Sequence, residues 1–266
     1  MTDFSMQCVI LAAGKGTRMG KLTKNTPKPL LKVGGKSILE RDLEALPDEI
    51  DEVILVVGYL GEKIREKFGD EFTPPSIPPL ARSTLLRATL SGIEWVVRRG
   101  KKMKITYVEQ KEPKGTADAL WSCKDILRDR FLVFYGDDMY AAGDLKKFVL
   151  EPLAILVWEM KKDESETRSA AVVKTDEEGN LVDIIERQPL KNCAVVNTGA
   201  YILDTRVFDY PMKSAGTPAG EYGLPQTFLQ MAKDGAKFKV IKATKWKKMT
   251  SPKDLSSRPT SRDPER

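Results

Sequence analysis

The feature that most constrains the fold is the alternation of short apolar runs with helical segments over the first half of the chain. Residues 8–13 form a continuous apolar run that ends at two glycines, which is typical of a strand buried on both faces. Similar strands are predicted at 51–57, 105–108 and 131–135, and helices at 37–46, 62–68 and 116–127. Ser37 and Glu40 have the spacing of a capping box at the start of the first helix. Strands that alternate with helices pair in parallel through right-handed crossovers. The pattern therefore predicts a doubly wound α/β fold with a mixed, mainly parallel sheet flanked by helices.

The second half of the chain changes to a strand-rich pattern. Strands are predicted at residues 154–159, 169–174, 181–185, 195–203 and 238–241, with one helix over 224–232. Four prolines in residues 73–79 interrupt the earlier rhythm, and apolar residues at helical spacing follow over 80–99. We expect a single domain over residues 1–255 with a proline-linked helical insert at 73–100. Residues 256–266 are polar and contain two prolines, so a disordered tail is expected there.

Composition excludes several classes of function. The chain has no histidine, which removes Ser-His-Asp and Cys-His nucleophilic systems and zinc sites that need an imidazole. Its three cysteines lack the Cys-x-x-Cys spacing of metal and redox sites, so we interpret them as reduced thiols of a cytoplasmic protein. The net charge of +6 without a basic stripe argues against nucleic acid as a partner, and no apolar run is long enough to span a membrane. A phosphorylated small molecule fits the modest positive charge.

A loop rich in glycine and cations, residues 14–21, follows the first strand, as in loops whose backbone amides wrap a phosphate chain. Its spacing argues against two common nucleotide motifs. A dinucleotide fingerprint needs two residues between its second and third glycines, whereas three separate Gly16 from Gly20. A Walker loop needs a hydroxyl after its Gly-Lys pair, whereas Leu22 follows Lys21.

A third pattern does match. The segments LAAGKGTRM at 11–19, TPKPLL at 26–31 and VGGK at 33–36 closely resemble the N-terminal motif of the sugar-1-phosphate nucleotidyltransferases. The resemblance continues through residues 110–120, 136–138, 186–187, 197–201, 220–222 and 246–255, so it covers nearly the whole chain outside the insert and the tail. It implies a Rossmann-like nucleotide-diphospho-sugar transferase fold. It also implies an enzyme that condenses a nucleoside triphosphate with a hexose-1-phosphate to give a nucleotide sugar and pyrophosphate.

The resemblance assigns roles to individual residues. Arg18 and Lys28 would be the catalytic cations that act on the phosphates, and Asp137 would hold Mg²⁺, the expected cofactor. Nucleotide-binding residues are expected at Leu11, Ala12, Ala13, Gly14, Gly16, Thr17, Gln110 and Gly115. Sugar-phosphate-binding residues are expected at Glu186, Arg187, Asn197 and Gly199. Because the attacking phosphate oxygen is already an anion, the reaction needs no general base, and a chain without histidine suits it.

Several positions depart from the family pattern, including Thr250, where a glycine is usual. Lys248 stands where a second metal-binding Asp is common, Ala171 where a glycine is normal, and Gln226 where an acid is usual. These changes motivate one alternative, a catalytically weak or inactive regulatory subunit that binds nucleotide sugars. A second alternative is a CTP-dependent enzyme that acts on a non-sugar phosphate. The base, the sugar and the oligomeric state, a homo-oligomer included, are left open, and no added C-terminal domain is expected.

Overall fold

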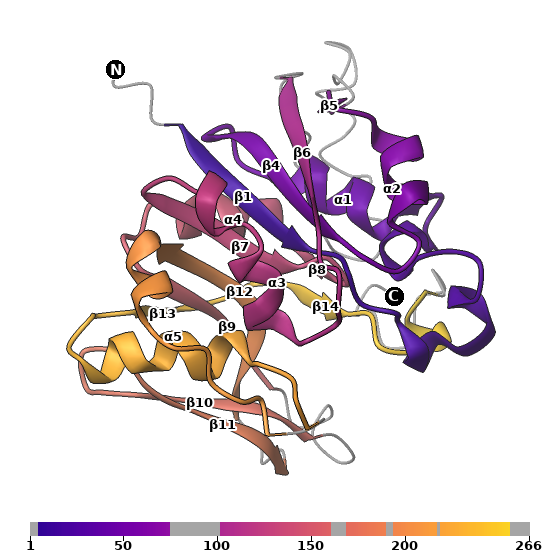
Figure 1. The fold of residues 1–266 in the computed structure, drawn as a ribbon. Helices are drawn as coiled ribbons and strands as arrows, with labels where there is room; N and C mark the ends of the chain where they lie inside the picture. The colour runs from indigo at the N-terminus through magenta and orange to yellow at the C-terminus, as the bar shows by residue number, and fades with distance from the viewer. Residues whose placement is uncertain (1–4, 75–101, 161–168, 190–193, 217–218, 256–266) are drawn as a thin grey trace, which may run out of the picture.

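The computed structural model describes residues 5–74, 102–160, 169–189, 194–216 and 219–255 (Figure 1). At its centre lies β1 (Met6–Leu11), which pairs in parallel with β4 (Ile50–Val57) on one side and β7 (Arg130–Tyr135) on the other. Beyond β4, β6 (Met103–Glu109) continues the parallel set. The strands predicted in the first half of the chain are thus confirmed, with β1 in the central position that its apolar run requires.

Helices cover both faces of this sheet. The α-helices of the described residues are α1 (Ile38–Ala45), α2 (Gly61–Phe68), α3 (Thr116–Trp121), α4 (Ala142–Phe148) and α5 (Leu224–Lys233). Successive side chains of β1 point to opposite faces, so Cys8 and Ile10 pack in the core with α1, α2 and α4, whereas Val9 packs with α3 and α5. In Figure 1, α5 lies in front of the sheet and α1 behind it. The doubly wound arrangement is therefore confirmed.

The second half of the chain extends the sheet with mostly antiparallel strands. They are β9 (Ala154–Glu159), β10 (Ser169–Thr175), β11 (Leu181–Pro189), β12 (Val195–Asp204) and β13 (Lys239–Lys242). β12 pairs antiparallel with β7 and so joins the two halves. The strand order is β11-β10-β12-β7-β1-β4-β6-β5, where β5 (Glu71–Phe72) is a short edge strand, and β9 and β13 continue from β12.

Two short strands bring the C-terminal segment to the centre of the molecule. β8 (Asp138–Tyr140) directly follows the turn after β7, and β14 (Trp246–Lys248) pairs with it antiparallel. In Figure 1, β14 runs beside β8 before the chain continues toward the loop that follows β1. A small hairpin, β2 (Lys32–Val33) and β3 (Lys36–Ser37), precedes α1. Two- and three-residue strands carry too little periodicity to be predicted from sequence.

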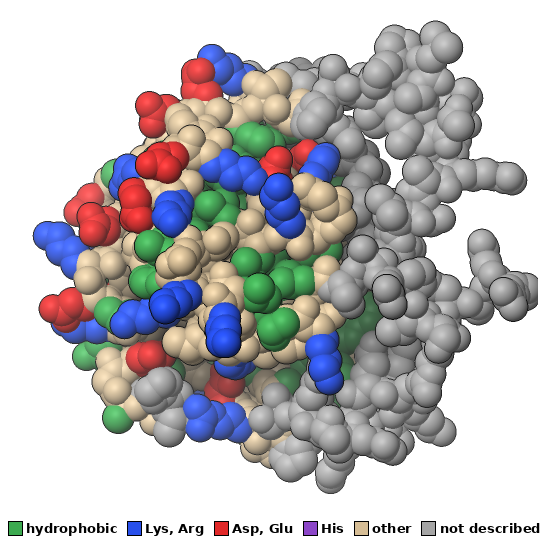
Figure 2. Space-filling model, turned by 90° about the vertical axis from the view of Figure 1, so that its right-hand side faces the viewer, with side chains coloured by type: hydrophobic (Ala, Val, Ile, Leu, Met, Phe, Trp, Pro, Cys, Tyr) green, Lys and Arg blue, Asp and Glu red, His purple; other side chains and the backbone are tan. Residues whose placement is uncertain are grey.

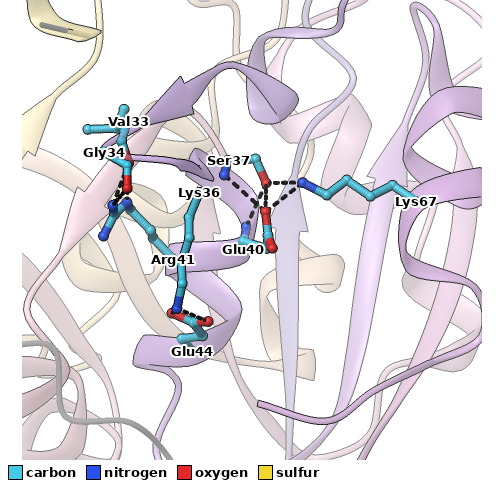
Figure 3. A network of polar contacts seen from close by, with 8 residues as sticks. All are labelled: Val33, Gly34, Lys36, Ser37, Glu40, Arg41, Glu44 and Lys67. Atoms are coloured by element: carbon cyan, nitrogen blue, oxygen red, sulfur yellow. Dashed lines mark hydrogen bonds and ion pairs between the residues drawn. The ribbon is translucent and has the colours of Figure 1, made fainter. Parts of the chain in front are cut away.

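A polar network fixes the start of α1 (Figure 3). The predicted capping box is present, because the Ser37 hydroxyl accepts from the backbone N–H of Glu40 at 3.2 Å and the Glu40 carboxylate accepts from that of Ser37 at 3.0 Å. Lys67 of α2 adds an ion pair to Glu40 at 2.5 Å. Arg41 donates to the carbonyl oxygens of Val33 and Gly34 and so holds the β2–β3 hairpin. The network ties the hairpin, α1 and α2 together.

One helix is shorter than predicted. α3 ends at Trp121 rather than continuing to residue 127, and a 3₁₀ turn (Lys124–Ile126) follows. The hydroxyl of Ser122 donates to the carbonyl oxygens of Asp118 and Ala119 at 3.0 Å, and this side-chain bonding competes with continuation of the helix. The helix expected at 80–99 and the tail at 256–266 lie outside the described residues. No helix in the described part of the chain is long and apolar enough to cross a membrane.

Candidate active site

A cavity of about 510 Å³ opens at the carboxyl ends of β1 and β7, which is where open α/β sheets place their ligands. The loop after β1, the segment after β6 and the turn after β7 form its walls. The predicted site residues that line it are Leu11, Ala12, Ala13, Gly14, Gly16, Thr17, Arg18, Lys28, Gln110, Gly115 and Asp137. Predicted site residues up to 126 positions apart in sequence thus lie around one cavity. The residues assigned to the sugar phosphate are not part of its lining.

The side of the molecule on the right of Figure 1 carries the loop that follows β1. Figure 2 shows that Lys and Arg side chains gather over the middle and lower part of this side, while Asp and Glu lie mostly toward its left and upper edge. A surface of this charge attracts polyanions to the neighbourhood of the cavity.

The loop after β1 keeps its shape through Gly16 and Thr23. Gly16 has a φ of +62°, in the left-handed region that favours glycine. A Cβ on this residue would lie 2.9 Å from the Cβ of Lys28, so glycine lets the loop pass close to the lysine. The Thr23 hydroxyl donates to the carbonyl oxygen of Gly16 at 3.0 Å. Arg18 lies in the 3₁₀ segment that follows, and its exposed side chain lines the cavity.

Lys28 and Asp137 form an ion pair at the cavity, with 2.6 Å between Nζ and Oδ2. Only 10% of the Lys28 side chain is exposed, compared with 39% for Asp137. Pro27 and Pro29 flank the lysine and fix its backbone in an extended-to-3₁₀ segment. Lys28 is therefore a largely buried cation, held at the cavity by its backbone and by the carboxylate.

Asp138 is adjacent in sequence but serves the fold. It is 3% exposed, and its carboxylate accepts hydrogen bonds from the indole N–H of Trp246 and the backbone N–H of Met249, both at 3.2 Å. Burial, together with the charge of Asp137, raises the pKa of Asp138 to about 8. Lys248 is the cross-strand partner of Asp138 in the β8–β14 pair. The Asp138 carboxylate is thus engaged inside the fold, and Asp137, the residue expected to hold Mg²⁺, is the one of the two that lines the cavity.

The described residues contain no group of three or more acidic or cysteine side chains that could hold a metal ion. A Mg²⁺ site at the cavity would therefore rely on the half-exposed Asp137. This donor set fits Mg²⁺, because the ion is commonly held by one or two carboxylates and completes its shell with substrate phosphates and water. Asp137 would have to exchange its bond to Lys28 for a bond to the ion.

The segment after β6 is clamped by the backbone of Tyr222. The N–H of Tyr222 donates to the carbonyl oxygen of Lys114 at 2.7 Å, and its own carbonyl accepts from the N–H of Ala117 at 3.0 Å. Gly115 lies between these bonds with a φ of +98°, and any Cβ there would collide with the Tyr222 backbone. Glycine at this position is thus required for contact between two parts of the chain, in addition to the predicted approach to a nucleoside.

The predicted sugar-phosphate residues lie outside the cavity lining. The Asn197 side chain donates to the Tyr201 hydroxyl at 2.7 Å and accepts from the N–H of Gly199 at 2.9 Å. Gly199 has a φ of +84° and packs against the ring of Tyr135, which leaves no room for a Cβ. These two residues support the wall of the cavity at Tyr135.

The carboxylate of Glu186 accepts a hydrogen bond from Gln226 at 3.0 Å, and Arg187 follows it with a φ of +54°. The sugar-binding roles of these two residues and of Asn197 and Gly199 stay predictions.

The residues that line the cavity without a role predicted from sequence include Tyr135, Thr116 and Glu221. Burial raises the pKa of Tyr135 to about 12, so its hydroxyl keeps its proton at neutral pH. Tyr135 precedes the Gly-Asp turn at the end of β7, and Thr116 follows Gly115. Because both residues adjoin predicted site residues in sequence, this adjacency was the signal that could have identified them. Glu221 reaches the cavity through the Tyr222 contact, which depends on tertiary structure.

Comparison with known proteins identifies the class of this fold and site. A family described as nucleotidyl transferase matches residues 7–257. Bifunctional protein GlmU of Methanocaldococcus jannaschii is 30% identical over 251 residues, which cover 94% of this chain and 52% of GlmU. UTP--glucose-1-phosphate uridylyltransferase AglF of Haloferax volcanii is 29% identical over 248 residues, which cover 91% of this chain and 90% of AglF. The chain thus spans about half the length of GlmU.

A solved structure agrees with this assignment at the level of the fold. The inositol-1-phosphate CTP transferase from T. maritima aligns with a TM-score of 0.69 and 20% identity over 96% of this chain and 93% of that chain. The chain therefore belongs to the nucleotidyl transferase family, and the predicted Rossmann-like fold is confirmed.

Proposed function

We propose that the chain is a nucleotidyltransferase that joins a nucleoside triphosphate to a hexose-1-phosphate and releases pyrophosphate. The observation that carries this proposal is the meeting of Arg18, Lys28 and Asp137 in one cavity with Gln110 and Gly115. Cations and a carboxylate lie at one set of walls, and a hydrogen-bonding amide with a tight glycine lies at another. This division suits a ligand with a triphosphate at one end and a base at the other.

The chemistry follows from the charges in the cavity. An oxygen of the sugar phosphate attacks the α-phosphorus, a new P–O bond forms, and the bond to the β-phosphate oxygen breaks with release of pyrophosphate. Arg18 and Lys28 offset the repulsion between the two polyanions and stabilise the charge that accumulates on the leaving group. The loop after β1 presents the α-phosphorus for in-line attack, since positioning supplies much of the rate in such reactions.

Mg²⁺ is the cofactor that we propose for this site. When bound, it would neutralise phosphate charge beside Asp137. Lys28 would then be released from its pair with Asp137 and could turn its ammonium group toward the phosphates. Because Lys248 pairs with Asp138 where a second metal-binding carboxylate was expected, Asp137 is the carboxylate left to hold the ion. The proposal also has Lys248 help to neutralise the charge of the phosphates.

The test is a matrix of five nucleoside triphosphates against several sugar-1-phosphates, with pyrophosphate release measured in the presence and absence of Mg²⁺. We expect release with at least one pair, dependent on Mg²⁺. Affinity for a nucleotide sugar without release under any condition would instead support the regulatory subunit that the departures at Lys248 and Ala171 suggested. Release with CTP and phosphocholine alone would support the enzyme for a non-sugar phosphate.

A further inference from the structure

The amide of Gln110 is held in one orientation. Gln110 follows β6, its backbone N–H donates to the carbonyl oxygen of Val57 at 2.8 Å, and the residue lines the cavity. The side-chain nitrogen Nε2 donates two hydrogen bonds, to the carbonyl oxygen of Gly115 at 3.0 Å and to Oδ2 of Asp118 at 2.7 Å. Both hydrogens of the amide nitrogen are therefore used within the protein.

The opposite orientation of this amide is excluded by chemistry. A backbone carbonyl and a carboxylate are both acceptors, so a flipped amide would place its own oxygen against two other oxygens. The acceptors are also fixed in space, because the bonds between Tyr222 and the segment 114–117 lock the backbone that carries them. No described residue donates to Oε1 of Gln110 in the present arrangement. The side chain thus offers a ligand one group, a carbonyl oxygen that accepts.

We propose that Asp118 is a positioning residue that turns the acceptor of Gln110 toward the base, so that the site prefers nucleotides whose base carries a hydrogen on its pairing-edge ring nitrogen. Uracil, thymine and guanine carry this ring N–H, whereas cytosine and adenine present a lone pair at the equivalent nitrogen. This inference rests on the proposed function in one respect, namely that the base lies against Gln110. It goes beyond that function by selecting one class of nucleotide.

The physical reason for the preference is the mismatch that the other bases create. A ring N–H would complete the hydrogen bonding of Oε1, whereas a ring lone pair would leave two acceptors facing each other. A site built for a hydrogen-bond donor rejects analogues that lack it, since its own polar group stays unpaired. We expect kcat/KM for the best of UTP, dTTP and GTP to exceed that for CTP and ATP by about 10- to 100-fold.

Asp118 allows a test that separates positioning from general structure. Asp118→Ala and Asp118→Leu remove the acceptor and free one N–H of Gln110, so the amide can turn. We expect the ratio of kcat/KM between the preferred nucleotide and CTP to fall at least fivefold in both variants. Asp118→Asn keeps an acceptor oxygen and should retain the ratio within about twofold, which a purely structural role of the residue would not predict. Asp125→Ala, at an exposed acid in the 3₁₀ turn after α3, is the matched control.

Binding measurements make the test independent of turnover. Isothermal titration calorimetry with UTP, GTP and CTP gives the corresponding ratio of dissociation constants, even where no pyrophosphate is released. A wild-type preference for CTP or ATP, or an unchanged ratio in both Asp118→Ala and Asp118→Leu, would overturn the positioning role. Absence of pyrophosphate release with every nucleotide, together with a normal binding ratio, would instead overturn the proposed function and leave the base preference standing.

Discussion

At the scale of the residue, the two cations of the cavity differ in their surroundings, and this difference separates their expected effects. Arg18 is exposed on the loop after β1, whereas Lys28 is largely buried and paired with Asp137. A change at Arg18 should therefore affect chemistry alone. A change at Lys28 should affect both chemistry and stability.

Arg18→Ala is expected to lower kcat for pyrophosphate release by at least two orders of magnitude, because it removes a charge that stabilises the leaving group. Its free energy of unfolding should stay within about 0.5 kcal/mol of wild type, as for other exposed positions. Steady-state kinetics and urea denaturation measure the two quantities. A rate within threefold of wild type would contradict the role of this residue.

Lys28→Ala is expected to lower kcat by a similar factor and also to destabilise the fold by about 1–2 kcal/mol, because the half-exposed carboxylate of Asp137 loses its partner. Lys32→Ala, at an exposed lysine of β2, is the control and should change neither quantity. The same urea titrations report the destabilisation. Equal stability of Lys28→Ala and wild type would show that the ion pair contributes nothing to the fold.

The residues of the site divide by how they could be found from sequence. Arg18, Lys28, Asp137 and the loop glycines lie in motifs with fixed spacing, and the structure brings them to one cavity. The role of Asp118 was not predicted. Asp118 lies eight residues after Gln110, and the path of the chain between them depends on the backbone hydrogen bonds to Tyr222. Sequence spacing alone carries no information on that clamp.

At the scale of the element, the capping box before α1 shows how a local signal becomes a link between helices. Ser37 and Glu40 predict the start of the helix, and the structure confirms it. The ion pair to Lys67 of α2 then joins elements that are 27 residues apart. Partial burial alone would raise the pKa of Glu40, but hydrogen bonds from Lys67 and Ser37 outweigh it and lower the pKa to about 2.

This shift gives the network a defined dependence on pH. The folded pKa lies below the ordinary value of 4.5, so the stabilisation is complete above about pH 4.5 and is lost as the pH falls toward 2. Because the pair is partly exposed, we expect about 1 kcal/mol rather than the full value of the shift. Glu40→Gln keeps the capping bonds and removes the charge.

The difference in unfolding free energy between wild type and Glu40→Gln should therefore be largest near pH 6 and should shrink between pH 4.5 and 2.5. Urea denaturation at a series of pH values measures it, and the comparison cancels the titration of the other carboxylates. A difference that is constant over this range would mean that the Lys67 ion pair has no share in stability.

At the scale of the whole molecule, the alternation of strands and helices was sufficient to predict the parallel centre of the sheet, because each apolar run has to be buried on both faces. The pairing of β12 with β7, which unites the two halves, could not be predicted from the same pattern. The hydrophobic periodicity of a strand indicates whether the strand is half-buried or buried, but it does not identify the strand that pairs with it. The short β8–β14 pair was missed for the same reason.

A second connection between the halves is the contact of Gly115 with Tyr222, and it supplies a prediction for the stability of the whole chain. Gly115→Ala places a Cβ against the Tyr222 backbone at a φ of +98°, so either the 114–117 segment or the start of α5 has to move. Strain and lost backbone hydrogen bonds together should cost about 3 kcal/mol or more. Far-UV circular dichroism and tryptophan fluorescence should still report one transition, shifted to lower urea.

Gly143→Ala is the matched control for this substitution. Gly143 lies in the first turn of α4 without a positive φ, and no atom lies within 4 Å of the position that its Cβ would take. Alanine is the better helix former, so this variant should be as stable as wild type or more stable by up to about 1 kcal/mol. If both variants unfolded at the same urea concentration, the Tyr222 contact would be ruled out as a connection between the halves, and the rigid support that we infer for the Gln110 amide would be removed with it.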